Sequence, residues 1–338
     1  MKRRNNLKYL LSIIIIVIGF TTKAQTLKPT PPSAFEPLLE FNTSFIKQQK
    51  VKSITFDIID KKDFEAPVDR NLTHFYEFDS IGLLKRFYYT TIVKTIEKEY
   101  HTEPVYRKRR KISSGSVYFK NEYVYDTIST VYIYQNTNLI LKRYNDGTYY
   151  ESRYYNYDAK NRLSKERRVK ETNLSSDKSN FILGSQTVIS EDSFQYLDIT
   201  PRQYKQICLN SENRPYKEII FNLDSVGNVI SKNESYTVAW IIQNVIYTYN
   251  KNRLASATFK GNANGDVVLK TTYEYDDMNC IYTEKQYKND VELKEISYVT
   301  EKANQRLNSF IIRDPIKKNM RIVKLLYVTD SLLVSEKH

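Results

Sequence analysis

The chain has 338 residues, with 52 lysines and arginines against 39 aspartates and glutamates, and its formal net charge is +13. This length is enough for one large domain or two modest ones, and the positive charge favours anionic partners. There are only 3 histidines and 2 cysteines, and the sequence has no zinc-ligand spacing, glycine-rich phosphate loop or nucleophile elbow. We therefore expect no metal, no cofactor and no catalytic residue.

Residues 1–24 have the organisation of a secretory signal peptide. An apolar stretch at residues 9–20 follows a basic start, and Thr22 and Ala24 place small side chains at both cleavage positions before Gln25. The stretch is shorter than the roughly 20 residues that cross a membrane, and no cysteine follows it to carry a lipid. We expect an exported chain with no transmembrane segment after signal cleavage; an uncleaved anchor is the alternative.

Residues 25–50 form an entry segment that precedes the main domain. Residues 28–37 are rich in proline and favour an extended chain, and residues 35–47 predict a short helix. No low-complexity linker divides the remainder, so we expect one domain over residues 51–338. Within it, residues 173–180 favour a surface loop, and Thr200 before Pro201 predicts a short helix over residues 201–209.

A short phrase recurs between residues 76 and 281. Two aromatic or apolar residues two positions apart are followed by Asp or Asn, then by Gly or Asn three residues later, then by an apolar residue. The clear copies are residues 76–84, 155–163, 221–229 and 273–281, and weaker copies are residues 132–140 and 247–254.

Each part of the phrase has a role in a β-hairpin. Side chains two apart lie on one face of a strand, Asp or Asn binds nearby backbone amides, and Gly or Asn tolerates the positive φ of a tight turn. Successive hairpins form an antiparallel meander. The sequence therefore predicts an all-β fold, a repetitive hairpin meander that forms an extended twisted sheet or a partial barrel.

The phrase Tyr-x-Tyr-Asp-x-x-Gly/Asn-x-Leu resembles the tyrosine-aspartate repeat of the Rhs and teneurin group. It is more similar still to short exported proteins of Gram-negative bacteria that carry degenerate copies of this repeat. Residues 51–56 also resemble the first strand of those proteins. The resemblance covers roughly residues 51–300. Large Rhs proteins wrap such strands into a closed shell around a toxin. This chain has far fewer repeats and no added C-terminal domain, so we carry over neither the shell nor the toxin.

Tyrosines supply the main candidate for a ligand surface. Tyr149, Tyr150, Tyr154 and Tyr155 are denser than the repeat requires, and aromatic rings on a sheet can stack on sugars. Cross-strand packing is the alternative explanation of the chain's tyrosines. The single tryptophan, Trp240, lies in an apolar run and is expected in the core.

One basic cluster is dense enough to bind an anionic partner. It consists of Arg107, Lys108, Arg109, Arg110 and Lys111. A solvated loop, or an edge strand protected from aggregation by its charges, explains the same residues. No nucleic-acid-binding fold accompanies the cluster, and we expect no nucleic-acid partner.

Two further sets of residues suggest covalent modification. Cys208 and Cys280 either form a disulfide that closes a loop of about seventy residues, or remain two separate buried thiols. An Asp-Ser/Thr-apolar motif resembles the acceptor of a bacterial O-glycosylation system, and turn chemistry explains it equally well. Its acceptor residues would be Ser80, Thr127, Ser225 and Ser331.

These observations favour an exported, non-catalytic binding or structural protein of the cell envelope. It would be periplasmic, at the cell surface or secreted, and its partner would be an envelope polysaccharide or protein. The alternative is a glycan hydrolase that uses two carboxylates. His74 precedes the first copy of the phrase, where an ordinary strand position is expected.

Overall fold

The computed structural model describes residues 25–29, 39–103, 105–107, 110–113, 115–147, 149–176, 180–237, 239–262 and 267–329. The predicted signal peptide at residues 1–24 lies outside them. Within the described segments, no helix is long and apolar enough to cross a membrane.

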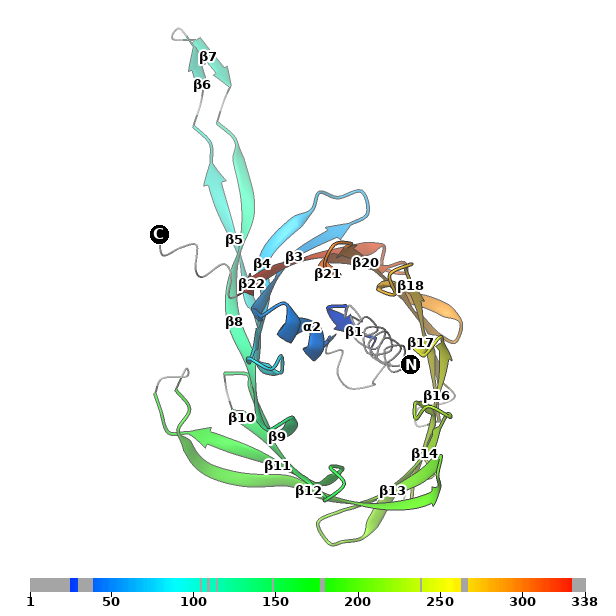
Figure 1. Cartoon of the computed structure of the whole chain (residues 1–338). Coiled ribbons are helices and arrows are strands. Elements are labelled where there is room, and N and C mark those ends of the chain that lie inside the picture. Colours follow the sequence, from blue (N-terminus) through cyan, green and yellow to red (C-terminus); the bar gives the residue numbers. More distant parts are fainter. Residues whose placement is uncertain are drawn as a thin grey trace, which may run out of the picture.

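Eighteen antiparallel strands form one closed barrel (Figure 1). The last strand, β22, pairs with the first, β3, from Thr329 opposite Val51 to Asn319 opposite Lys62. The strands are β3 (Val51–Lys62), β4 (Val68–Phe78), β5 (Leu84–His101), β8 (Val117–Gln135), β9 (Asn138–Asn145), β10 (Tyr150–Tyr157), β11 (Leu163–Asn173), β12 (Leu183–Thr200), β13 (Gln203–Leu209), β14 (Pro215–Leu223), β15 (Val229–Tyr236), β16 (Ile242–Asn250), β17 (Arg253–Gly261), β18 (Val267–Tyr275), β19 (Ile281–Lys288), β20 (Val291–Glu301), β21 (Arg306–Asp314) and β22 (Asn319–Thr329).

The predicted all-β hairpin meander is confirmed. The expected partial barrel is only roughly right and the extended open sheet is wrong, because the strands close into a complete barrel. Closure satisfies the backbone groups that two terminal strands would otherwise leave at free edges. It depends on the pairing of segments more than 250 residues apart, such as Ile322 with Ile59. A local repeat cannot show such a pairing.

The repeated phrase forms its turns in the predicted way. The Asp79 carboxylate accepts hydrogen bonds from the amides of Ile81 and Leu83 at 3.0 and 2.8 Å, and Gly82 has a φ of +90°. Asp158, Asp224 and Asp276 bind the amides two and four residues later in the same manner. Asn210 does so too, which reveals a copy of the turn that the sequence analysis missed.

The second aromatic residue of the phrase ties adjacent hairpins together. The Tyr249 hydroxyl donates to the Val229 carbonyl at 2.9 Å, and the Tyr275 hydroxyl donates to the Leu254 carbonyl at 2.7 Å. Tyr157, Tyr196 and Tyr327 make the same kind of bond to Leu139, Leu163 and Leu307. This bond explains why the position favours tyrosine over phenylalanine, since a phenyl ring has no donor.

A plug, defined here as residues 25–29 and 39–50, lies inside the barrel (Figure 1). Strand β1 (Leu27–Lys28) pairs with β2 (Glu40–Phe41), and helix α2 (Thr43–Gln48) follows. Asn42 caps this helix by accepting a hydrogen bond from the Ser44 amide at 3.1 Å. The helix expected over residues 35–47 therefore exists, but it starts later, at Thr43.

The plug completes the main hydrophobic core. Phe45 and Ile46 of α2 are 1% and 0% exposed, and they belong to a buried cluster with residues of β3, β4 and β20–β22. Two polar contacts also hold the plug. The Ile281 amide donates to the Gln25 side-chain oxygen at 2.8 Å, and the Leu307 amide donates to the Thr26 hydroxyl at 3.0 Å.

A long two-stranded arm projects from the barrel (Figure 1). It is made by the distal parts of β5 and β8, with β6 (Val105–Arg107) and β7 (Arg110–Ser113) near its tip. Of the predicted basic cluster, Arg107, Arg110 and Lys111 lie on these two short strands. Lys108 and Arg109 lie outside the described residues.

Two local expectations are wrong. Residues 203–209 form strand β13, paired on both sides with β12 and β14, so Pro201 occupies a turn between strands and no helix starts there. Trp240 is 88% exposed and has a φ of +51°. The apolar run that contains it spans the connection between β15 and β16, where the side chain leaves the sheet.

The two faces of the barrel wall differ in polarity. Between β13 and β18 the strand registers place the apolar side chains Ile219, Phe221, Val245, Tyr247, Phe259 and Tyr273 on the inner face, together with the polar side chains Gln206, Lys217, Lys232, Glu234, Gln243 and Thr271. The outer face there has the apolar side chains Ile207, Ile220, Ile242, Ile246 and Val268 among mainly polar ones, which include Lys205, Glu218, Asn222, Ser231, Asn233, Asn244, Thr248, Ser256, Thr258, Lys260, Lys270 and Thr272.

Candidate functional site

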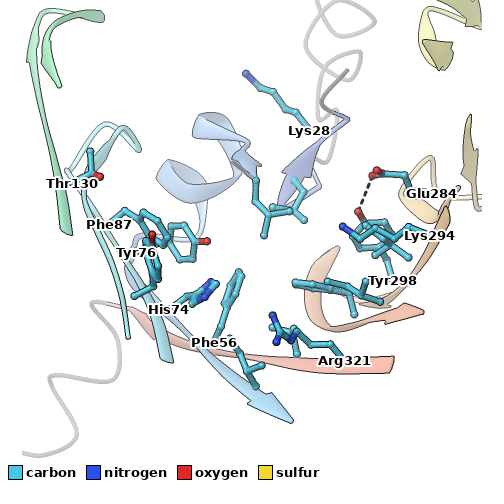
Figure 2. Close-up of a pocket in the computed structure, with 18 of the residues that line it drawn as sticks. Lys28, Phe56, His74, Tyr76, Phe87, Thr130, Glu284, Lys294, Tyr298 and Arg321 are labelled. Atoms are coloured by element: carbon cyan, nitrogen blue, oxygen red, sulfur yellow. Dashed lines mark hydrogen bonds between the residues drawn. The ribbon is translucent and has the colours of Figure 1, made fainter. Parts of the chain in front are cut away.

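A cavity of about 700 Å³ lies inside the barrel, between the plug and the inner wall (Figure 2). The plug contributes Leu27, Lys28 and Leu39 to its lining. The wall contributes residues of β3–β5, β8–β10 and β19–β22. Because alternate residues of a strand share a face, each wall strand presents two or three side chains at this level.

Aromatic rings form the apolar floor of this pocket. The Phe56 ring centroid lies 4.9 Å from that of Tyr76 and 5.7 Å from that of Phe310. Phe87 stacks on Tyr76 with centroids 4.6 Å apart. Phe56 and Tyr76 are only 2% and 3% exposed, so the floor is continuous with the hydrophobic core.

His74 adds a neutral polar group to the floor. Its ring stacks on Phe56 at 6.1 Å and packs against Phe87 and Tyr89. Burial, assisted by the nearby positive charge of Arg321, lowers the pKa of His74 from 6.5 to about 4. The imidazole is therefore uncharged at neutral pH. His74 lies in a strand, as expected, but at a position in the pocket wall that the sequence analysis did not single out.

Glu284, Lys294 and Tyr298 form a polar group on one side of the pocket (Figure 2). The Tyr298 hydroxyl donates to Glu284 at 3.1 Å, and the Gln286 side-chain amide donates to the other Glu284 oxygen at 2.7 Å. Burial lowers the pKa of Lys294, while the negative charge of Glu284 partly opposes the shift. Within the described part of the chain, no ion pair or hydrogen bond is formed by the Lys294 ammonium.

Arg321 reaches the same pocket from β22 but is already paired. Its guanidinium makes two hydrogen bonds to the Asp60 carboxylate, at 2.7 and 3.2 Å. This fork-to-fork geometry fixes both side chains. Arg321 therefore contributes positive potential to the pocket with little freedom to take another partner.

The opposite wall carries a second set of charges. Glu151 accepts two hydrogen bonds from Arg168, both at 2.7 Å, and these lower the pKa of Glu151. Burial raises the pKa of the neighbouring Glu166. Arg153 lies 3.6 Å from each of these carboxylates. Glu151 belongs to β10, nine strands away from Glu284 on β19 in either direction around the ring of eighteen, so these two carboxylates face each other across the whole barrel.

The four predicted ligand-binding tyrosines do not form one surface. Tyr155 is paired with Glu166 on the inner face, and the Lys170 ammonium lies 5.0 Å from the Tyr149 ring centroid. Tyr150 and Tyr154 belong to the outer face. The alternation of β10 separates the two pairs, because neighbouring residues on a strand point to opposite faces.

On the outer face, Tyr154 belongs to a buried network around Glu171. This carboxylate is 1% exposed and accepts hydrogen bonds from Tyr154, Arg143 and Gln186 at 2.6–2.8 Å and from Ser152 at 2.5 Å. Burial opposes its ionisation, but the donors outweigh this effect and lower the pKa of Glu171. A complete set of donors indicates a structural role for the cluster.

The chain that follows β11 covers this network. The Arg143 guanidinium lies 4.0 Å from the Phe181 ring centroid, and Phe181 packs on Tyr150 at 4.5 Å. Residues 174–176 and 180–182 form no helix or strand, as the expected loop requires. Residues 177–179 lie outside the described part of the chain.

The proposed modification sites have different surroundings. Cys208 and Cys280 are both free and buried, so the alternative of two separate thiols holds. Ser80 and Ser225 are exposed in hairpin turns, and Thr127 is exposed on β8. Ser331 lies outside the described residues. Glycosylation at Ser80, Thr127 and Ser225 stays a prediction.

The sequence did contain a signal for the pocket. Tyr76 and Tyr132, each the first aromatic residue of a repeat copy, both line it. Counting back by two from these tyrosines gives His74 and Thr130, which also line it. Among the described residues, no group of three or more His, Cys, Asp or Glu side chains has the arrangement of a metal site.

No family model matches the chain, and no curated protein matches it. Among solved structures, the chain is similar to a porin-like protein from Bacteroides uniformis ATCC 8492, with 10% identity, a TM-score of 0.35, and coverage of 82% of this chain and 98% of that chain. A porin-like protein from Bacteroides vulgatus ATCC 8482 has 8% identity and a TM-score of 0.31 over the same shares of the two chains.

A chain of the TcdB2-TccC3-Cdc42 structure is also similar, with 13% identity and a TM-score of 0.26. That similarity covers 70% of this chain but only 12% of the other. Similarities this weak assign neither a family nor a function.

Proposed function

We propose that this protein is an exported, non-catalytic binding protein of the cell envelope that holds its ligand inside the barrel. The observation that carries the proposal is the pocket of about 700 Å³ with an aromatic floor bordered by polar and charged side chains. Most ligand sites combine this volume with this kind of lining.

The interior is a better site than the outer sheet surface. The outer tyrosines Tyr150 and Tyr154 are engaged with Phe181 and Glu171, so their rings and hydroxyls already serve the packing of the wall. The inner rings of Phe56, Tyr76 and Phe87 border open volume. An envelope polysaccharide or protein, the partners favoured by the sequence, would enter with one terminal unit or side group.

The polarity of the wall supports a water-exposed location. A barrel that spans a membrane has an outward apolar band flanked by aromatic girdles. Here the outer positions between β13 and β18 carry mainly Lys, Glu, Asn, Ser and Thr. Together with the predicted signal peptide, this pattern favours a periplasmic, surface-exposed or secreted protein that meets water on the outer wall between β13 and β18.

Ligand recovery tests the proposal. Residues 25–338 are incubated with envelope extract without detergent, recovered, and analysed by native mass spectrometry. A bound species of defined mass is expected. The variant Ile296→Trp, which fills the pocket, should lose it, and Ile246→Trp, on the outer wall, should retain it. Equal retention by both variants, or no bound species with the unmodified chain, would contradict the proposal.

A glycan hydrolase is the second candidate. The inner wall holds two carboxylates, Glu151 and Glu166, whose pKa values are shifted in opposite directions, as a base and an acid require. Release of reducing sugar from envelope polysaccharide that is abolished by Glu166→Gln, with folding intact, would favour this candidate. Absence of release by the unmodified chain would exclude it for the polymers tested.

A further inference from the structure

Positive side chains outnumber negative ones in the lining of the pocket. Lys28, Lys142, Arg153, Lys294 and Arg321 line it, against the carboxylates Glu151 and Glu284. Three of these cations pair with carboxylates outside the lining, Arg321 with Asp60, Arg153 with Glu166 and Lys28 with Glu40. Both lining carboxylates have hydrogen-bond donors from the protein, Glu151 from Arg168 and Glu284 from Gln286 and Tyr298. The positive potential of the lining therefore comes from the cations outside these three pairs.

Lys294 is the cation best placed to use this potential. Arg321 is committed to Asp60 through two hydrogen bonds, and Arg153 is shared between Glu151 and Glu166. Lys294 has no such partner within the described residues, although it stands beside Tyr298 and faces the cavity (Figure 2). A buried ammonium is stabilised when an anion and further hydrogen bonds replace its lost hydration.

The apolar part of the lining indicates which kind of anion would bind beside Lys294. Phe56, Phe87, Phe310, Ile296 and Val323 border the same cavity. A small, strongly hydrated anion such as inorganic phosphate would leave these rings unused. An apolar body attached to the charged group would fill the cavity beside them. Phe56, Phe310, Ile296 and Val323 are themselves only 2–6% exposed, so the gain of roughly 25 cal/mol for each Å² of apolar surface removed from water would come mainly from the ligand's own surface.

We propose that the pocket binds an organic monoanion, a carboxylate carried on a hydrocarbon or aromatic body, with the carboxylate on Lys294 and the apolar body against Phe56, Phe87 and Phe310. This inference rests on the proposed function and names its ligand class. His74, neutral among the rings, offers one hydrogen bond to an uncharged polar atom of the body. The Lys294 ammonium alone would bind the ligand's charged group, so a ligand with one negative charge fits the pocket better than a ligand with two.

Three ligands with the same ten-carbon chain and different head groups test whether the pocket prefers a negative charge. Decanoate, 1-decanol and decyltrimethylammonium are titrated calorimetrically into residues 25–338 below their micellar concentrations. We expect decanoate to bind at least tenfold more tightly than 1-decanol, and decyltrimethylammonium to bind most weakly. Acetate, which has the charge without the body, should not bind measurably at 10 mM.

Two matched variants test whether Lys294 binds the carboxylate. Lys294→Met keeps the length and apolar stem, and it should weaken decanoate binding at least tenfold while leaving 1-decanol binding unchanged. Lys285→Met, on the outer face of the adjacent strand β19, should bind all probes like the unmodified chain. An unfolded Lys294 variant would be recognised by lost 1-decanol binding, and Lys294→Gln would then replace it.

The outcomes separate this inference from the proposed function. Equal affinity for decanoate and 1-decanol, unchanged decanoate binding in Lys294→Met, or no binding of any probe overturns the organic monoanion. Recovery of an envelope ligand that Ile296→Trp abolishes would still sustain a pocket-binding protein with a different ligand class. If no probe binds and no envelope ligand is recovered, the proposed function is overturned as well.

Discussion

The barrel strands that share a buried cluster with the plug, and the strands β13–β18, whose described residues do not belong to that cluster, are of the same kind but packed differently; they are called here the plugged half and the open half. In the plugged half (β3, β4 and β20–β22), Ile54, Phe56 and Phe310 are 0–4% exposed and join one cluster with Phe45 and Ile46. In the open half (β13–β18), buried apolar residues such as Ile219 and Val245 lie outside this cluster. The repeat therefore makes strands and turns everywhere, whereas the core forms where the plug fills the interior.

Removing the Phe45 ring, which the plug buries in the core, should have the largest effect on stability. Phe45→Ala in α2 is expected to lower the free energy of unfolding by about 3–5 kcal/mol, because it removes a ring that is 1% exposed and leaves a cavity in the buried cluster. Phe259→Ala, on the half-buried inner face of the open half, should cost clearly less. Urea unfolding of both variants measures the difference, and equal losses would contradict the contrast between the halves.

One part of the acid sensitivity should originate in the plugged half, at His74, in addition to the contribution of carboxylates elsewhere whose pKa is lowered. The pKa of His74 is about 4 in the folded protein against 6.5 when exposed, so its contribution is complete above pH 6.5 and is lost as the pH falls toward 4. The loss between pH 7.5 and pH 4.5 should be about 2–3 kcal/mol from this residue alone.

His74→Phe separates this contribution from that of the carboxylates. The variant keeps the aromatic packing and removes the titration, so its stability should fall about 2–3 kcal/mol less than that of the unmodified chain over the same pH interval. Urea unfolding at the two pH values measures this difference. Identical pH dependence in both proteins would show that the imidazole stays accessible to protons.

Two glycines at the same repeat position provide a matched comparison. Gly82 and Gly227 have φ values of +90° and +92°. A Cβ at Gly82 would overlap the Thr43 carbonyl oxygen of the plug, whereas a Cβ at Gly227 would meet no atom within 4 Å. Gly227→Ala should therefore cost about 1 kcal/mol for the left-handed backbone, and Gly82→Ala about 2–3 kcal/mol, because α2 must also shift.

Thermal unfolding of the two glycine variants tests this comparison. We expect Gly82→Ala to shift the midpoint at least twice as far as Gly227→Ala. If the two shifts are the same, the turn does not support the plug.

The smallest expected effect concerns the tyrosine bonds between hairpins. Tyr249→Phe in the open half removes the bond to the Val229 carbonyl and should cost about 0.5–1 kcal/mol. Tyr327→Phe leaves the carbonyl of Leu307, a residue that is 3% exposed, without its donor and should cost about 1–2 kcal/mol. Urea unfolding of the two variants gives both values, and a larger loss for Tyr249→Phe would reverse the predicted order.

Turns and strand faces could be predicted because they depend on residues a few positions apart in the sequence. The predictions failed where contacts between distant segments determine the position of a side chain. The turns at Asp79, Asp158, Asp224 and Asp276 follow from side chains that bind amides two and four residues away. Trp240 was misplaced because an apolar run has the same composition in a core strand and in an exposed turn. The four tyrosines were grouped by sequence density, although alternation along β10 places them on opposite faces.

The amino-acid sequence by itself determined the all-β class, the hairpin turns and the alternation of side chains between the two faces of each strand, because these depend on residues a few positions apart. Only the tertiary structure decided that β22 closes on β3, that residues 25–29 and 39–50 lie inside the barrel, and that Lys294 faces a pocket with Phe56 and His74. Those contacts join segments more than 200 residues apart. Their formation depends on barrel closure and shared burial, which no local pattern encodes.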